Sequence, residues 1–161
     1  MRAYLPAAVR LLPHRLTLCP MAEIRLARSD DEIRACYPVM SQLRSHVGRE
    51  EFLKHVRRQA DEGYRLAFLE IDGRPATVAG YRILHQLVAG KVLYVDDLVT
   101  DEALRSGGLG ARMLEWLLSE ARRAGCRSFE LDSATHRTPA HRFYRRQGMD
   151  ATSLHFRKPV R

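Results

Sequence analysis

The chain has 161 residues, of which 45% are hydrophobic and 29% are charged, a composition typical of one globular domain with a substantial core. It contains no run of about 20 apolar residues, the length needed to span a bilayer, so no membrane partner is expected. The formal net charge of +8 favours anionic ligands such as nucleic acid or a phosphorylated small molecule. Because basic and acidic residues are interleaved, much of this charge is typical of solvated helix faces.

Residues 1–20 differ in composition from the rest of the chain. They contain three arginines, three prolines and no acidic residue. We interpret them as an N-terminal tail, either a mis-called start or a flexible extension, ahead of one domain over residues 21–161. A transit peptide or a secretion signal is the alternative, although Arg10 and Pro13 interrupt the apolar run that a signal would need.

The three cysteines, Cys19, Cys36 and Cys126, are far apart and form no CxxC pair. Scattered cysteines of odd number suit a reducing compartment better than a disulfide framework, so we expect a cytoplasmic protein. His136 and His141 are five residues apart and share no helix face, so no metal site is expected.

The first part of the domain is predicted to be a strand followed by two helices. The strand covers Ile24–Ala27, and a capping box over Ser29–Glu32 begins a helix that runs to about Arg44. Pro38 lies inside this helix and predicts a kink or a break. Apolar positions at helical spacing predict a second helix over Glu50–Asp61.

The remaining elements alternate between strands and helices. Three strands come first, with a hairpin turn at Asp72–Gly73 joining the first two: Tyr64–Ile71, Thr77–Leu84 and Lys91–Thr100. A helix, a strand and a short helix follow: Gly108–Ala124, Ser128–Ser133 and Ala140–Gln147. Residues 149–158 are expected to supply one or two last strands. This order predicts a mixed α/β fold, with helices on both faces of the sheet.

A glycine-rich segment, RSGGLGAR at residues 105–112, connects the third of these strands to the long helix. It matches neither the Walker loop nor the full dinucleotide fingerprint, because Met113 stands at the last glycine position of the latter. Glycines that allow backbone N–H groups to converge, the positive end of a helix and two arginines nevertheless favour an anion such as pyrophosphate. The alternative is a plain turn with Gly107 at positive φ.

This segment resembles the R/Q-x-x-G-x-G/A motif of the GNAT superfamily of N-acetyltransferases. Two further blocks resemble the same family in the expected order: the central strand Tyr94–Thr100, YVDDLVT, and the later helix Ala140–Met149, AHRFYRRQGM. The resemblance covers residues 23–158. It implies the GNAT fold, a mostly antiparallel mixed sheet flanked by helices and splayed at its central strands, with acetyl-CoA as the acyl donor.

The resemblance also implies which residues bind the donor. The pyrophosphate would lie on Arg105, Ser106, Gly107, Gly108, Leu109, Gly110, Ala111 and Arg112. The pantetheine arm would pair with Leu98, Val99 and Thr100, and the backbone N–H of Leu98 would reach the thioester carbonyl. Arg137 stands where many family members carry asparagine, so it either meets a phosphate, lines the acceptor site or makes no donor contact.

Three residues are candidates for catalysis, namely Tyr144, Asp96 and Leu98. Tyr144 aligns with the family's general acid, and a phenol with an ordinary pKa of about 10 stays protonated at neutral pH. Asp96 aligns with the acidic position that serves as base or orients the amine. Asp97 follows it directly, so the two carboxylates are expected on opposite faces of the strand. The alternatives are a core position for Tyr144 and a structural role for both carboxylates.

We therefore predict an enzyme that transfers an acetyl group from acetyl-CoA to an amine by direct attack. The two carboxylates favour a small cationic acceptor, while a peptide N-terminus or a lysine is the alternative. Rivals from other classes are a non-enzymatic acyl-CoA-binding module and a basic nucleic-acid-binding domain, for which the sequence has no helix-turn-helix signature. The family also suggests a homodimer through the C-terminal strands, which the sequence does not decide.

Overall fold

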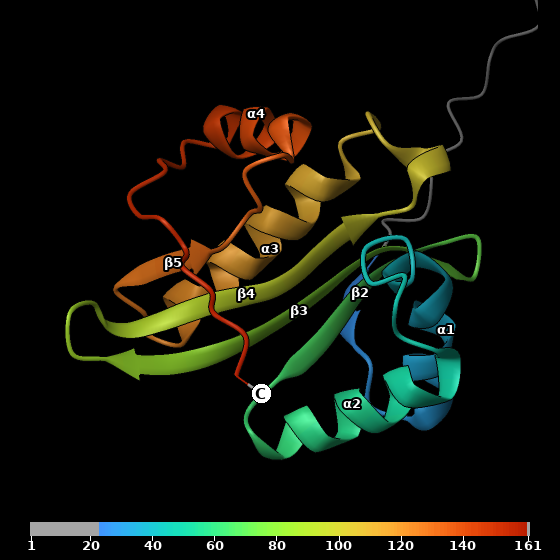
Figure 1. The fold of residues 1–161 in the computed structure, drawn as a ribbon. Helices are drawn as coiled ribbons and strands as arrows, with labels where there is room; N and C mark the ends of the chain where they lie inside the picture. The colour runs from blue at the N-terminus through green and yellow to red at the C-terminus, as the bar shows by residue number, and fades with distance from the viewer. Residues whose placement is uncertain (1–22, 161) are drawn as a thin grey trace, which may run out of the picture.

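The computed structural model describes residues 23–160 as a five-stranded sheet with helices on both faces (Figure 1). The interpretation of residues 1–20 as a tail lies outside the described residues. The elements in chain order are β1 (Ile24–Leu26), α1 (Asp30–Met40), α2 (Arg49–Asp61), β2 (Arg65–Ile71), β3 (Arg74–Gln86), β4 (Gly90–Thr100), a 3-10 turn η1 (Glu102–Leu104), α3 (Leu109–Arg123), β5 (Ser128–Leu131) and α4 (Thr138–Arg146).

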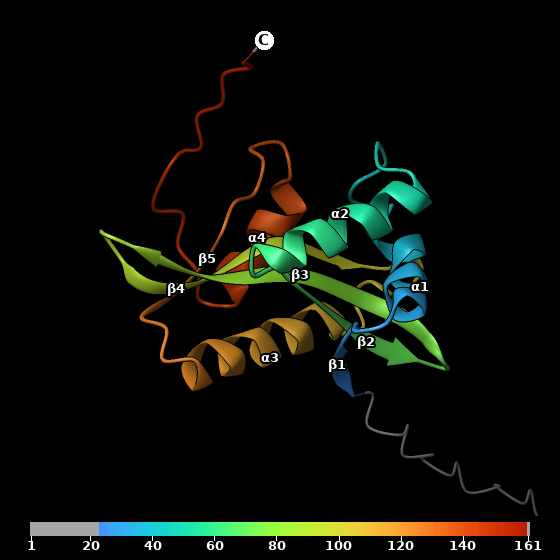
Figure 2. The same ribbon diagram turned by 90° about the horizontal axis from the view of Figure 1, so that it is seen from below.

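The strands lie in the order β1-β2-β3-β4-β5, and every pair is antiparallel except β4 and β5, which are parallel. Helices α1 and α2 cover one face of the sheet and α3 covers the other (Figure 2). Two core clusters result: Phe68 and Val78 pack toward α1 and α2, while Tyr81 and Leu93 pack toward α3. The predicted fold class, a mostly antiparallel mixed sheet with helices on both faces, is confirmed.

Helix α1 begins as predicted and ends earlier than predicted. The Ser29 hydroxyl accepts from the Glu32 backbone N–H, and the Glu32 carboxylate accepts from the Ser29 N–H, so the capping box is confirmed. These backbone donors, with that of Arg28, lower the pKa of Glu32 to about 2. The helix continues through Pro38, whose missing N–H removes one bond inside the helix, and it ends at Met40. Arg44, predicted to be helical, therefore lies in the α1–α2 loop.

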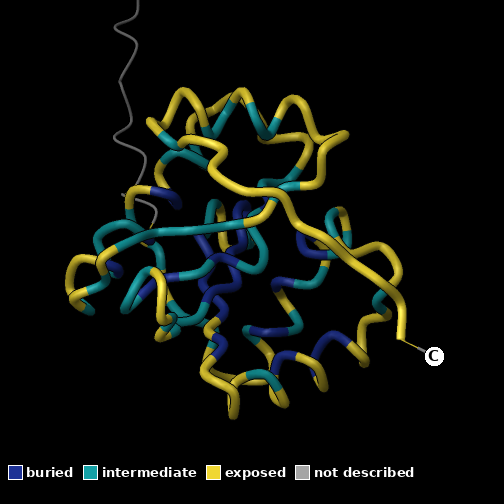
Figure 3. Tube along the Cα trace, turned by 60° about the vertical axis from the view of Figure 1, so that its left-hand side comes forward, coloured by how far each residue is buried: buried dark blue, intermediate teal, exposed yellow. Residues whose placement is uncertain are grey.

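The hairpin between β2 and β3 is confirmed. Asp72 and Gly73 have φ of 49° and 75°, as a two-residue turn with two left-handed positions requires. The prediction of one or two strands over residues 149–158 is wrong, because the chain has no secondary structure there and residues 150–160 are exposed (Figure 3). The exposed side chains of Leu154 and Phe156 contribute nothing to the core, so this segment lacks the buried face that would stabilise a strand.

Candidate active site

The predicted donor-binding residues come together in space. All of them except Gly107 and Arg112 line one cleft of about 570 Å³. The sequence prediction missed other residues that line it, among them Gln42 and Leu43 from the turn after α1, and Phe143 and Arg146 from α4. Three arginines and no carboxylate line the cleft, which therefore favours an anionic ligand.

The cleft lies where strands β4 and β5 diverge. Their pairing ends at Val95 and Leu131, whereas β4 continues to Thr100 and keeps its pairing with β3. The predicted splay is thus confirmed. Residues 96–100 of β4 pair with β3 on one edge, and β5 does not pair with their other edge. Leu98 and Thr100 lie on this stretch and line the cleft. A free strand edge offers backbone groups to an extended ligand.

The glycine segment forms an open loop at the start of α3. Ser106 and Gly108 have φ of 68° and 80°, while Gly107 between them is outside the left-handed region, so the alternative of a plain turn with Gly107 at positive φ is wrong in this detail. Such an alternation turns successive N–H groups toward one side, which is how backbone anion sites form. Gly108 is the N-cap of α3, no side chain caps this helix, and its first turn has no acidic residue. The Arg105 Nε donates to the Thr100 carbonyl at 3.2 Å, which holds the loop to the end of β4.

Tyr144 lines the cleft from α4 and is half-buried. Its ring lies 5.3 Å from that of Phe143, measured between centroids. Phe143 packs near the start of α3, because a Cβ at Gly110 would lie 3.6 Å from the Phe143 Cζ. The Tyr144 hydroxyl makes no hydrogen bond within residues 23–160. Burial raises the pKa of Tyr144, and the positive charge of Arg137 opposes this rise.

A β-bulge in β4 puts Asp96 and Asp97 on the same face of the sheet. In the register with β3, Gly80 pairs with Asp97 and Tyr81 pairs with Val95, so Asp96 is the extra residue. The alternation of side chains inverts there: Val95 belongs to the core under α3, while Val99 belongs to the core under α1 and α2. The prediction that the two carboxylates face opposite sides is therefore wrong.

The two carboxylates have different partners. Asp97 is nearly buried, and both of its oxygens are engaged, because Oδ1 accepts from Arg44 Nε at 2.7 Å and Oδ2 accepts from the Tyr64 hydroxyl at 3.0 Å. Asp96 is more exposed and uses only Oδ2, which accepts from Arg82 Nε at 2.9 Å. Burial raises the pKa of Asp96, and the contact with Arg82 opposes this effect. Asp96 thus keeps one oxygen available, and Asp97 has the geometry of a structural carboxylate.

The cations that neutralise these carboxylates could not be identified from the sequence. Arg82 comes from β3, directly opposite Tyr94, and its guanidinium lies 5.6 Å above the Tyr64 ring. Arg44 follows the end of α1 at Met40, and its Nη2 also donates to the Asp96 carbonyl at 3.0 Å. Arginine content alone gives no signal for such pairs, which depend on where a helix ends and where a strand bulges.

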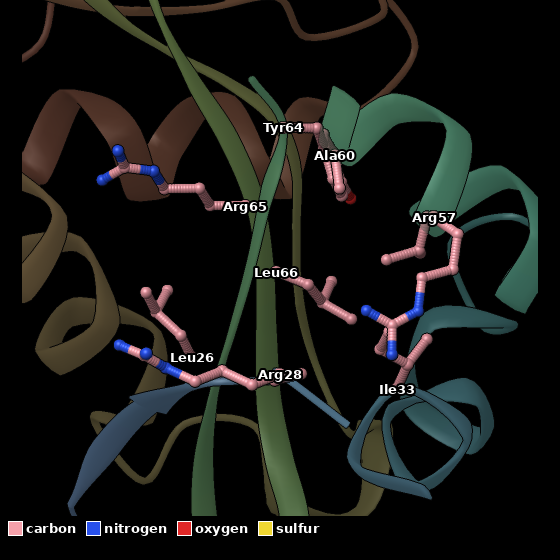
Figure 4. Close-up of a pocket in the computed structure, with 10 residues that line it drawn as sticks. Leu26, Arg28, Ile33, Arg57, Ala60, Tyr64, Arg65 and Leu66 are labelled. Carbon is pink, nitrogen blue, oxygen red and sulfur yellow. The ribbon is translucent and has the colours of Figure 1, made fainter. Parts of the chain in front are cut away.

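A second hollow, of about 190 Å³, lies between β2 and the two helices α1 and α2 (Figure 4). Its floor is apolar, with Ile33 and Leu66 facing inward, and Arg57 at its rim is paired with Asp30. It contains none of the predicted site residues. Within residues 23–160, no group of three or more His, Cys, Asp or Glu side chains could hold a metal ion, and no helix is long and apolar enough to cross a membrane.

Comparison with known proteins agrees with this geometry. The acetyltransferase (GNAT) family profile matches residues 28–149. The chain is 32% identical to an uncharacterized N-acetyltransferase, YhdJ, from Bacillus subtilis, over 87% of this chain and 100% of that protein. It is 28% identical to the aminoalkylphosphonate N-acetyltransferase of Salmonella typhimurium, over 93% of this chain and 99% of that protein.

Solved structures show the same fold. An aminoglycoside N-acetyltransferase in complex with CoA superposes with a TM-score of 0.77 at 15% identity, covering 86% of this chain and 94% of that one. Glucosamine-6-phosphate N-acetyltransferase from Arabidopsis thaliana gives a TM-score of 0.70 at 23% identity, with 86% and 98% covered. On the combined evidence of profile match, sequence identity and sheet topology, the chain belongs to the acetyltransferase (GNAT) family and is an N-acetyltransferase.

Proposed function

We propose that this protein transfers an acetyl group from acetyl-CoA to a small amine. The observation that carries the proposal is the cleft itself, which joins an open glycine loop at a helix N-terminus to a splayed strand edge and a half-buried tyrosine. The loop N–H groups and Arg105 would hold the pyrophosphate, and Leu98–Thr100 would pair with the pantetheine arm. The cleft has no carboxylate to repel the pyrophosphate.

Acetyl-CoA supplies a thioester, whose C–S bond breaks as the bond to the acceptor nitrogen forms. Asp96 would orient the amine and accept its proton, directly or through water, at the carboxylate oxygen that Arg82 leaves free. The backbone N–H of Leu98 would donate to the carbonyl oxygen as it gains charge. Tyr144 would donate its phenolic proton to the departing sulfur.

The acceptor class is inferred from relatives and from charge. One relative is named for aminoalkylphosphonates, and the structure of another protein of this fold contains a bisubstrate analogue of an aminoglycoside. Both names denote small amines, which supports a small acceptor here. Arg82 and Arg44 neutralise the two carboxylates, so a strongly cationic acceptor is less favoured than the carboxylates alone suggested. An acceptor screen should therefore include aminophosphonates, aminoglycosides, polyamines and peptides.

Replacing Gly108 tests donor binding. We expect Gly108→Glu to abolish acetyl-CoA binding, because it puts a carboxylate beside the converging N–H groups. Gly108→Ala is the matched control: it carries the same backbone strain of about 1–2 kcal/mol at φ of 80°, without the charge, and a Cβ there has no atom within 4 Å. Calorimetry should give micromolar binding for the wild type and at most a several-fold loss for alanine. Failure of the folded wild type to bind would refute the proposal.

The carboxylates should respond differently to neutralisation. Asp96→Asn is expected to lower kcat by about 10- to 100-fold with little loss of stability. Asp97→Asn is expected to destabilise the fold by about 1–3 kcal/mol, because Arg44 and Tyr64 lose a charged acceptor. Steady-state rates give kcat of both variants, and urea unfolding gives their loss of stability. Equal kcat losses without destabilisation of Asp97→Asn would contradict the assignment.

Asp96 also gives a pH dependence. As the base, Asp96 must be ionised, so kcat/KM should fall as the pH decreases through its pKa, which burial places above the ordinary range. Arg82 favours the ionised form, so Arg82→Gln should raise this pKa and move the acidic limb of the profile to higher pH. An unchanged limb would mean that another group sets it.

A further inference from the structure

Arg137 lines the cleft and has no structural task that accounts for its side chain. It is the N-cap residue of α4, yet its side chain makes no capping hydrogen bond. Within residues 23–160 it forms no ion pair through its guanidinium, although it is one of the three arginines that line the cleft. An unpaired cation in a cleft without carboxylates is available to a ligand or to a reacting group.

Arg137 and Tyr144 line the same cleft, and both come from α4. Tyr144 follows seven residues later, which is two turns of α4, so both residues lie on one face of the helix. Helical side chains tilt toward the N-terminus, so the Tyr144 ring leans back toward Arg137. The electrostatics agree with this placement, because the charge of Arg137 acts on the Tyr144 phenol and lowers its pKa against the effect of burial.

We propose that Arg137 is the electrostatic partner of Tyr144 and stabilises the negative charge of the leaving thiolate, and that it is not a ligand of a donor phosphate. This inference rests on the proposed acetyl transfer. The other charged side chains lining the cleft are Arg105, in the glycine loop, and Arg146, at the far end of α4. Arg137, at the start of α4, is thus the cation on the same side of the helix as Tyr144.

The charge that Arg137 would stabilise follows from the balance of the reaction. The acceptor nitrogen contributes an electron pair to the new C–N bond, and the pair of the C–S bond leaves with the sulfur. The phenolic proton of Tyr144 passes to this sulfur and leaves a negative charge on the tyrosine oxygen. The proton lost by the acceptor nitrogen goes to Asp96 or to water and later restores the phenol through solvent. A fixed cation beside the phenol stabilises both anionic forms.

Binding of CoA and of desulfo-CoA, which has no thiol, tests this role without turnover. If Arg137 favours the thiolate, the wild type should bind CoA increasingly better than desulfo-CoA between pH 7 and pH 9. A thiol has an ordinary pKa of about 8.5, and a bound thiol with a pKa of about 7.5 makes the ratio of the two affinities rise about sixfold over this range. In Arg137→Gln the rise should fall below about twofold, and Arg137→Lys should restore part of it.

Arg142→Gln is the matched control, since Arg142 is exposed on the same helix and does not line the cleft. It should behave like the wild type in both titrations. In turnover, Arg137→Gln should lower kcat by about tenfold, with the Kd of acetyl-CoA within about threefold, and Arg137→Lys should recover part of the loss. Arg137→Gln should also move the basic limb of the kcat profile to higher pH, because the pKa of Tyr144 would rise.

Each contrary outcome has a separate meaning. A wild type that binds neither CoA nor desulfo-CoA refutes the proposed function itself. A wild-type affinity ratio that does not change with pH overturns the role of Arg137. So does an equal loss of CoA and desulfo-CoA affinity in Arg137→Gln at every pH, which would identify Arg137 as a phosphate ligand. An Arg142→Gln protein that matches Arg137→Gln would also overturn it, because the effect would then be one of net charge.

Discussion

Replacing Tyr144 by phenylalanine is expected to lower kcat by about 10²- to 10³-fold, while the Kd of acetyl-CoA changes by less than about threefold. Phenylalanine keeps the ring that packs beside Phe143 and removes only the hydroxyl. That hydroxyl has no hydrogen-bond partner within the described residues, so the variant should be as stable as the wild type. Burial keeps the pKa of Tyr144 above its ordinary value, so the phenol is protonated at neutral pH and can donate.

Rapid-mixing rates and calorimetry would measure the two effects separately. Tyr37→Phe is the control, because its hydroxyl donates to the Val47 carbonyl at 3.1 Å in the α1–α2 region, away from α4. It should retain the wild-type kcat. If Tyr144→Phe also retains it, Tyr144 is a packing residue like Phe143, and the proton must come from solvent or another group.

Most of the fold could be predicted because its signals are local. The capping box of α1 and the Asp72–Gly73 hairpin depend on a few neighbouring residues, and both are confirmed. The C-terminal strands were predicted wrongly because Leu154 and Phe156 supply the alternation of a strand but have nothing to pack against. A strand depends on its neighbours in space more than on its own residues.

The sequence predicted which residues of the glycine segment and of β4 line the cleft, but it did not predict the surroundings of the two carboxylates. The glycine loop is contiguous in sequence, so its residues necessarily meet. The environment of Asp96 depends on a bulge in β4 and on Arg82 in another strand, and neither has a sequence signature. The bulge also places Asp97 against Tyr64, so the local rule of alternating faces failed at the point where the site is built.

Gly80→Ala should be the most destabilising single change near this site. A Cβ at Gly80 would lie 1.8 Å from the Tyr64 hydroxyl oxygen and 2.3 Å from the Tyr64 Cζ. The Tyr64 side chain is buried and hydrogen-bonded to Asp97, so it cannot move without breaking that bond. We expect the free energy of unfolding to fall by about 2–4 kcal/mol, from overpacking and from the lost charged hydrogen bond.

Urea unfolding of three variants would separate these causes. Tyr64→Phe removes the hydrogen bond alone and should cost about 1–2 kcal/mol, less than Gly80→Ala. Gly48→Ala, where a Cβ has no atom within 4 Å, is the control for the substitution itself and should cost no more than about 1 kcal/mol.

The double variant Gly80→Ala, Tyr64→Phe should cost less than the sum of its single changes, because both act on one ring. Displacement of that ring also removes a partner of Asp97 beside the bulge, so kcat of Gly80→Ala should fall even where the protein is folded.

A Gly80→Ala protein as stable and as active as Gly48→Ala would show that the bulge does not depend on close contact between Gly80 and Tyr64. In that case the ion pairs of Asp96 with Arg82 and of Asp97 with Arg44 would be enough to hold the two carboxylates in place without Tyr64.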